Sequence, residues 1–189
     1  MNMRKIDDEI QALLSEHRGD IRSILKDNHR LDLLYALSSQ RELLLEWYDF
    51  EPEAEVLQVG ADYGALTGLL RSSVSAVTVL DDTESALETV RQRYPGAANI
   101  HYHKDSLTGY AAEACAEGKK YDYVIFAGTL TAPYEDHIHA AKALLKPEGI
   151  LIVASANALG MKYFAGTVEE ENALTKRQLM ELLCGDKEN

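Results

Sequence analysis

The sequence predicts an α/β protein with a doubly wound, mostly parallel sheet and an N-terminal helical extension. From Glu55 onward, short apolar runs alternate with segments of helical period, the pattern of consecutive βα units. The run at 149–155 is almost entirely apolar, as expected for a central parallel strand covered on both faces. A length of 189 residues and a hydrophobic content of 46% suit one such domain plus the extension.

The first fifty residues are helical by period. Apolar residues recur at helical spacing in two runs, first Ile6, Ile10, Leu13 and Leu14, and then Leu31, Leu34 and Leu37. We therefore expect residues 1–50 to form a helical cap and residues 51–189 an α/β domain. Trp47 and Tyr48 are expected to anchor the cap to the sheet.

Five strands are expected, at 55–59, 76–80, 99–103, 121–127 and 149–155. Thr83 is a suitable N-cap for the helix after the second strand, and the segment at 146–149 should end the helix after the fourth. A last amphipathic helix is expected near 176–183. The expected strand order is 3-2-1-4-5 without a terminal hairpin, so a helix, a second copy in a homodimer or solvent must cover the outer edge.

Composition excludes several classes of protein. The 31 acidic residues outnumber the 19 basic ones, so the net charge of −12 makes nucleic acid an unlikely partner. Cys115 and Cys184 have no metal-ligand spacing, which favours a reducing, cytoplasmic location. We expect no membrane span, since no stretch approaches about 18 apolar residues. The acids at 169–171 are expected to form a solvated surface.

Candidate ligand-binding residues follow the first three strands. Gly60 and Gly64 bracket a tight turn after the first strand, where glycine lets the backbone approach a ligand. Asp81 ends the second strand 21 residues after Gly60, a spacing suited to a carboxylate that accepts from ribose hydroxyls. Asp105 and Ser106 end the third strand and could meet an adenine edge. Together these residues favour a nucleoside-type cofactor.

Charge distinguishes the possible cofactors. A dinucleotide site would have glycine at 60, 62 and 65, whereas this chain has Asp62 and Ala65. A carboxylate that faces a pyrophosphate is unfavourable. S-adenosylmethionine lacks phosphate and carries a sulfonium and an ammonium group, so acids suit its pocket.

The segments EVLQVGADYGALTGLL, VTVLDD, KYDYVIFAGTL and LLKPEGILIVASAN, in this order, resemble the motifs of class I S-adenosylmethionine-dependent methyltransferases. The resemblance covers roughly residues 31 to 183 and implies a Rossmann-like fold. It implies that Gly60 and Gly64 shape the cofactor loop, that Asp81 holds the ribose and Asp105 faces the adenine, and that Gly128 lies near the methyl group. The segments LLYALSSQRELLLEWYDF and NALGMKYFAG further resemble a bacterial branch associated with glycosyltransferases, which implies a small-molecule or saccharide-type acceptor.

The chain departs from that pattern at several positions. Gln58 replaces an acid at the end of the first strand, and Asp62 replaces the middle glycine of the loop, where it could take over the ammonium contact. Thr131 and Ala156 stand where that branch often has acids, which leaves His137 as a candidate general base. Beyond this candidate, no catalytic residue is predicted.

Two alternatives stay open: a catalytically eroded binding or assembly module, and a nucleotide-sugar or dinucleotide enzyme. His101 and His103 share a strand face but have no further ligands in sight, so no metal site is expected.

Overall fold

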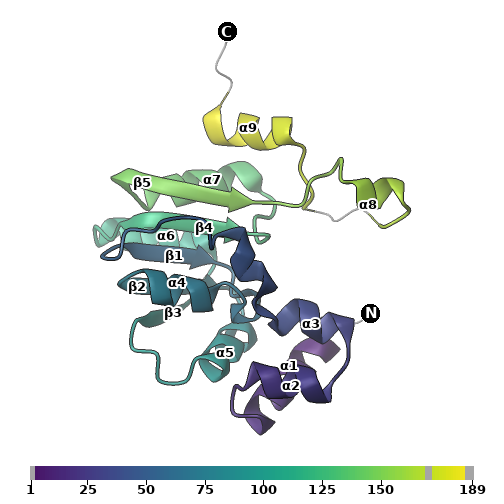
Figure 1. Cartoon of the computed structure of the whole chain (residues 1–189). Coiled ribbons are helices and arrows are strands. Elements are labelled where there is room, and N and C mark those ends of the chain that lie inside the picture. Colours follow the sequence, from purple (N-terminus) through teal and green to yellow (C-terminus); the bar gives the residue numbers. More distant parts are fainter. Residues whose placement is uncertain (1–2, 169–171, 186–189) are drawn as a thin grey trace. The chain divides into compact units, whose positions relative to one another are not determined.

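The computed structural model describes residues 3–168 and 172–185 (Figure 1). The five expected strands are β1 (Glu55–Val59), β2 (Ala76–Asp81), β3 (Ile100–Lys104), β4 (Tyr121–Ala127) and β5 (Leu145–Ala154). They follow the order β3-β2-β1-β4-β5, which confirms the predicted order. The pairs β1/β2, β2/β3 and β4/β5 are parallel. Within the described ranges, the only pairing outside these strands is an isolated bridge between Asn157 and Leu174.

The chain divides into two compact units, Met1–Ser106 and Leu107–Asn189. The domain boundary expected at residue 50 stays a prediction. The acidic run at 169–171, expected to be a solvated surface, lies outside the described residues, as does the tail after Gly185.

The first unit begins with the expected helices, α1 (Met3–Glu16), α2 (Ile21–Asp27), α3 (Leu31–Leu37) and the 3₁₀ helix η1 (Ser39–Leu44). We call residues 3–44 the N-terminal extension; its helices lie beside one another in Figure 1. They enclose a small core of their own, formed by Ile10, Leu14, Ile24, Leu33 and Leu37. The helical period of the sequence thus places these side chains on faces that bury one another.

The rest of the first unit consists of β1 to β3 with α4 (Thr67–Ser73) and α5 (Glu84–Arg93). The middle residues of β1 and β2 are buried, as their apolar sequences require. The extension docks on α5, where the Gln11 side-chain amide donates to the Ser85 carbonyl at 2.7 Å and to its hydroxyl at 2.8 Å. Polar contacts therefore join α1 to α5.

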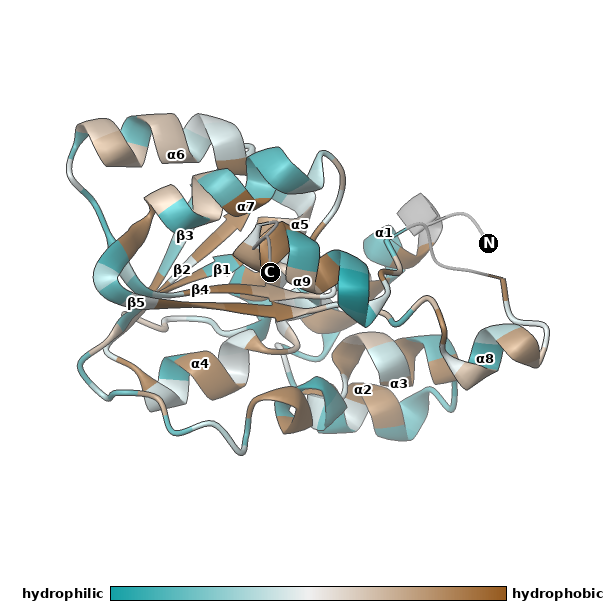
Figure 2. Ribbon diagram, turned by 90° about the horizontal axis from the view of Figure 1, so that it is seen from above, coloured by the Kyte–Doolittle hydropathy of each residue, from teal (hydrophilic) through white to brown (hydrophobic). Residues whose placement is uncertain are grey.

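The second unit contains β4 and β5 with α6 (Leu107–Ala116), α7 (Tyr134–Ala143), α8 (Met161–Phe164) and α9 (Lys176–Cys184). Figure 2 shows α6 and α7 on the same side of β4 and β5. Val124, Ile125 and Phe126 of β4 are fully or almost fully buried. A capping box formed by Thr175 and Gln178 begins α9.

Thr83 occupies the N-cap position of α5 as expected, although its side chain makes no capping bond. Two other expectations about local structure are wrong. Trp47 does not anchor the extension, because it is 77% exposed and its indole N–H donates to the Leu44 carbonyl. β5 begins at Leu145 and not at 149, so the helix-breaking segment lies inside the strand.

The early start of β5 has a structural reason. Its pairing with β4 jumps from Tyr121–Leu145 to Tyr123–Ile150, so the residues between form a bulge. A bulge, like an edge strand, tolerates a proline that cannot donate to a ladder. β5 is also the last strand in the sheet order and most of its residues are only half-buried, unlike the covered strand that its apolar sequence suggested.

A candidate ligand-binding turn after β1

The turn from β1 to α4 has an unusual backbone. Gly60 has φ +88°, and then Asp62, Tyr63 and Gly64 have φ values of +41°, +53° and +70° in succession. A non-glycine residue in this left-handed region costs on the order of 1 to 3 kcal/mol and persists only where its surroundings hold it. The short 3₁₀ helix η2 (Asp62–Gly64) is therefore a strained segment with two non-glycine members.

Asp81 lies directly beside this turn. Its Oδ2 accepts from the Ala61 backbone N–H at 2.9 Å, while its Oδ1 accepts from the Thr83 N–H at 2.9 Å and the Thr83 hydroxyl at 2.8 Å. Each carboxylate oxygen has two acceptor sites, so Oδ2 retains one for a ligand hydroxyl. A second ligand hydroxyl could replace the Thr83 hydroxyl on Oδ1.

The expected binding residue Gln58 is engaged within the protein. It is only 3% exposed, its amide donates to the Gly60 carbonyl at 3.0 Å, and its side-chain carbonyl accepts from Thr67 at 2.8 Å. The hydrogen bonds at both ends of the side chain thus stabilise the turn. This arrangement makes Gln58 a support of the turn in this structure.

Asp62 forms an ion pair with Arg41 of η1. The Asp62 side chain is only 19% exposed and that of Arg41 is 46% exposed. Burial raises the pKa of the Asp62 carboxyl above its ordinary value, and the positive charges of Arg41 and Arg93 oppose this rise. The Asp62 carboxylate is therefore a largely buried acid that has one cationic partner, Arg41, and lies in the field of a second cation, Arg93.

The turn is also held by residues that the sequence analysis did not single out. Arg93, at the end of α5 and only 8% exposed, donates to the Tyr63 carbonyl at 2.9 Å. The Tyr94 hydroxyl donates to the Gly64 carbonyl at 2.8 Å. The one sequence signal for these contacts is an arginine among the apolar positions of α5, which alone does not identify its acceptors.

The remaining candidates occupy separate places. The Asp105 backbone N–H donates to the Asp81 carbonyl at 3.1 Å, and its carboxylate accepts from the Ser106 N–H at 2.7 Å, so Asp105 and Ser106 lie next to the end of β2. Gly128, with φ +80°, and His137 belong to the second unit. The His137 Nδ1 lies 2.9 Å from the Thr131 carbonyl.

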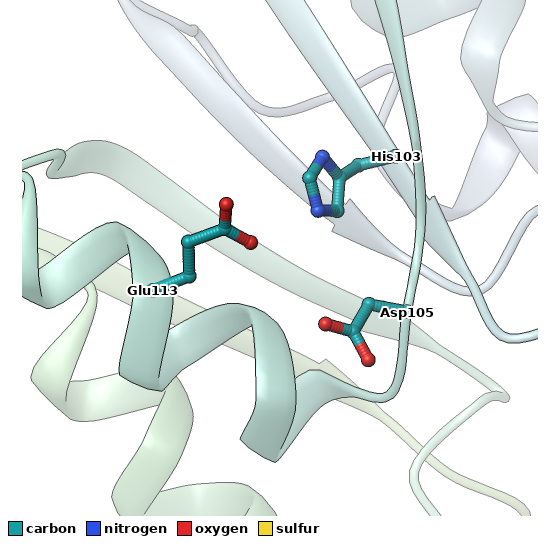
Figure 3. Close-up of side chains that lie close together, drawn as sticks. All are labelled: His103, Asp105 and Glu113. Atoms are coloured by element: carbon teal, nitrogen blue, oxygen red, sulfur yellow. The ribbon is translucent and has the colours of Figure 1, made fainter.

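His103 and Asp105 point to the same side at the end of β3 (Figure 3). Glu113, the third side chain drawn there, belongs to α6 of the second unit. Two ligands are fewer than the three or four that a protein zinc site takes. The expectation of no metal site stays a prediction.

Neither a family model nor a curated protein matches the sequence. Solved structures match its fold. The N-methyltransferase NodS from Bradyrhizobium japonicum, in complex with S-adenosylhomocysteine, is 19% identical with a TM-score of 0.61, over 92% of this chain and 83% of that one. A putative methyltransferase from Bacillus halodurans is 17% identical with a TM-score of 0.60, over 77% and 67%.

The [4+2]-cyclase SpnF also shares the fold, with 17% identity and a TM-score of 0.61, over 78% of this chain and 56% of that one. These likenesses confirm the expected Rossmann-like methyltransferase fold. A cyclase among them means that this fold does not by itself determine the reaction. Of the helices that the structure describes, none has the length and hydrophobicity to span a membrane.

Proposed function

We propose that the chain binds S-adenosylmethionine at the turn after β1 and transfers its methyl group to a small-molecule acceptor. The observation that carries this proposal is the Asp81 carboxylate, which is fixed beside the turn by the Ala61 N–H and keeps acceptor capacity on Oδ2. A carboxylate at this place suits the ribose hydroxyls of a nucleoside. The fold shared with the S-adenosylhomocysteine complex of NodS supports the same cofactor.

The charges around the turn favour this cofactor over a dinucleotide. Asp62 and Asp81 are both acidic, and the chain as a whole carries a net charge of −12. A pyrophosphate would be repelled by these groups, whereas an ammonium or a sulfonium would be attracted. Asp62 would share its acceptor sites between Arg41 and the ammonium, while the Gly60 backbone would allow close approach of the ligand.

The bound cofactor would supply an electrophilic methyl group. The protein would contribute mainly by holding the donor and the acceptor in line, since positioning alone can account for a large part of such a rate enhancement. His137 is the candidate to take a proton from the acceptor. By resemblance to the bacterial branch associated with glycosyltransferases, the acceptor would be a saccharide-type molecule.

Isothermal titration calorimetry with S-adenosylmethionine, S-adenosylhomocysteine and NAD tests the proposal. We expect the first two ligands to bind and NAD to fail. Asp81→Ala should weaken binding by about 1.5 to 3 kcal/mol, the scale of a hydrogen bond to a charged group. Asp82→Ala, at the exposed neighbouring position, is the matched control and should bind as the parent does. Equal affinity of the Asp81 and Asp82 variants would show that Asp81 does not bind the cofactor.

A second candidate function is a binding module without turnover. Gln58 favours it, because both ends of its side chain form hydrogen bonds inside the protein. Binding of S-adenosylhomocysteine without methyl transfer to any acceptor of a saccharide and amine panel would support this candidate. Methyl transfer in that panel would exclude it.

A further inference from the structure

The Tyr63 side chain joins the ligand turn to the N-terminal extension. Its ring packs against the buried cluster that forms the core of the extension. Its hydroxyl donates to the Asp7 carboxylate of α1 at 2.7 Å. A residue at the centre of the strained turn is thus anchored, by both its ring and its hydroxyl, in a part of the chain some fifty residues earlier.

The backbone of the same residue is held from a second direction. The buried Arg93 guanidinium donates through Nη1 to the Tyr63 carbonyl and through Nη2 to the Leu37 carbonyl, both at 2.9 Å. Leu37 ends α3 and belongs to the core of the extension. One buried cation therefore connects the turn, α5 and the extension, and a guanidinium can make such paired bonds in a fixed geometry.

Each of the three consecutive residues with a left-handed backbone is held by a contact with a side chain from elsewhere in the chain. Asp62 pairs with Arg41 of η1, Tyr63 with Asp7 and Arg93, and Gly64 accepts from Tyr94. Strained conformations persist only where surrounding contacts over-determine them. Two of these holding side chains, Asp7 and Arg41, come from the extension itself.

We propose that Tyr63, together with Asp7 and Arg93, positions the turn for its ligand, so that docking of the extension and ligand binding are thermodynamically linked. The inference rests on the proposed function, because it concerns the same turn. None of the three residues is assigned contact with reacting atoms. If docking of the extension strengthens ligand binding, the ligand must strengthen docking by the same factor.

Calorimetry with S-adenosylhomocysteine measures one direction of this linkage, the effect of the extension's contacts on ligand affinity. Tyr63→Phe keeps the ring in the core and removes only the hydroxyl, and Asp7→Ala removes its acceptor. Each variant should bind roughly 3- to 30-fold more weakly, the scale of coupling through residues that do not touch the ligand. The double variant should be no weaker than either single one, because both remove the same bond.

Gln11→Ala is the matched control. Gln11 lies one turn after Asp7 on α1 and bonds to α5, not to the ligand turn. Its removal leaves the bond between Tyr63 and Asp7 in place. Because the proposed linkage passes through Tyr63, the effect of Gln11→Ala on affinity should be clearly smaller than that of Asp7→Ala. An equal loss in the two variants would overturn the assignment of Tyr63 and Asp7 as positioning residues.

Hydrogen exchange measures the other direction of the linkage, the effect of the ligand on docking of the extension. Saturation with S-adenosylhomocysteine should slow amide exchange in α1 of the parent, and this ligand-dependent protection should shrink in Tyr63→Phe. Parent affinity and full protection in Tyr63→Phe would overturn the inference while leaving the proposed function intact. A parent chain that binds no S-adenosylhomocysteine would instead overturn the proposed function itself.

Discussion

The Thr67 hydroxyl donates a 2.8 Å hydrogen bond to the side-chain carbonyl of Gln58, and the two residues are 0% and 3% exposed. The other end of Gln58 donates to the Gly60 carbonyl. A buried amide can satisfy a donor and an acceptor at once, whereas a carboxylate only accepts. Gln58 therefore matches its two partners in a way that an acid would not.

We expect Gln58→Glu to lower the free energy of unfolding by about 1 to 3 kcal/mol, because the Gly60 carbonyl would lose its donor and face a buried charge. Urea unfolding at neutral pH measures this change. The same substitution at Gln40, which is exposed, should stay within about 0.5 kcal/mol. Equal stability of the two variants would contradict the role assigned to Gln58.

The fold could be predicted because its signals are local. Helical periodicity identified the extension, and short apolar runs identified five strands whose order is confirmed. The prediction that β5 is a central, covered strand was wrong, because an apolar sequence does not distinguish a covered strand from an outer one. Its bulge depends on pairing with β4, which local sequence does not encode.

The contacts that hold the candidate turn could not be predicted, because they are distant in the sequence. Arg93 reaches acceptors 30 and 56 residues away, and Tyr63 reaches an acceptor 56 residues away. Glycine spacing identified the turn, but the left-handed geometry of Asp62 and Tyr63 depends on these partners. The binding roles expected for Asp81, Asp105 and Gly128 stay predictions.

We expect Gly64→Ala to destabilise the protein more than Gly96→Ala. Both glycines have similar positive φ values, +70° and +74°. A Cβ on Gly64 would lie 3.1 Å from the Tyr94 ring and 3.2 Å from Arg93 Cδ, whereas a Cβ on Gly96 would meet nothing within 4 Å. The backbone cost, on the order of 1 kcal/mol, is shared, so the difference between the variants reports crowding at the turn.

The comparison of the two glycine variants uses thermal or urea unfolding. A greater loss at position 64 is expected, because the Arg93 side chain that would have to move is buried and carries two hydrogen bonds. Equal losses at both positions would mean that Arg93 and Tyr94 can shift freely. The turn would then be held less firmly than its contacts suggest.

The stability of the protein should depend on the ionisation of Asp62. Burial raises the pKa of this carboxyl above 3.8, so the folded state binds the proton more tightly than the unfolded state does. Its contribution is fully present below the ordinary carboxyl pKa and is lost as the pH rises through the folded-state value. Asp62→Asn cannot ionise, so its stability relative to the parent should increase over that pH range.

Urea unfolding of the parent and of Asp62→Asn, from about pH 3.5 to 7, measures this dependence. Arg41→Gln is the second comparison, because Arg41 lowers the pKa of Asp62 and its removal should extend the loss to higher pH. A parent and an Asp62→Asn variant with parallel pH profiles would show that the carboxyl ionises equally in both states.

Asp62→Gly should change stability and ligand affinity in opposite directions. Glycine adopts the φ of +41° without steric strain and removes a carboxylate whose burial is unfavourable. These gains should exceed the loss of the half-exposed Arg41 ion pair, worth at most about 1 kcal/mol, so the free energy of unfolding should rise at neutral pH. If Asp62 holds the ligand ammonium, the same change should weaken S-adenosylhomocysteine binding by about 1.5 to 3 kcal/mol. Calorimetry and urea unfolding on one preparation give both values.

Higher stability with lower affinity is the expected pair of results for Asp62→Gly. Strain that is retained at a position where glycine would relieve it indicates a functional use. Tighter binding in Asp62→Gly would instead mean that the carboxylate obstructs the ligand, and the binding module without turnover would then be the better account of the chain.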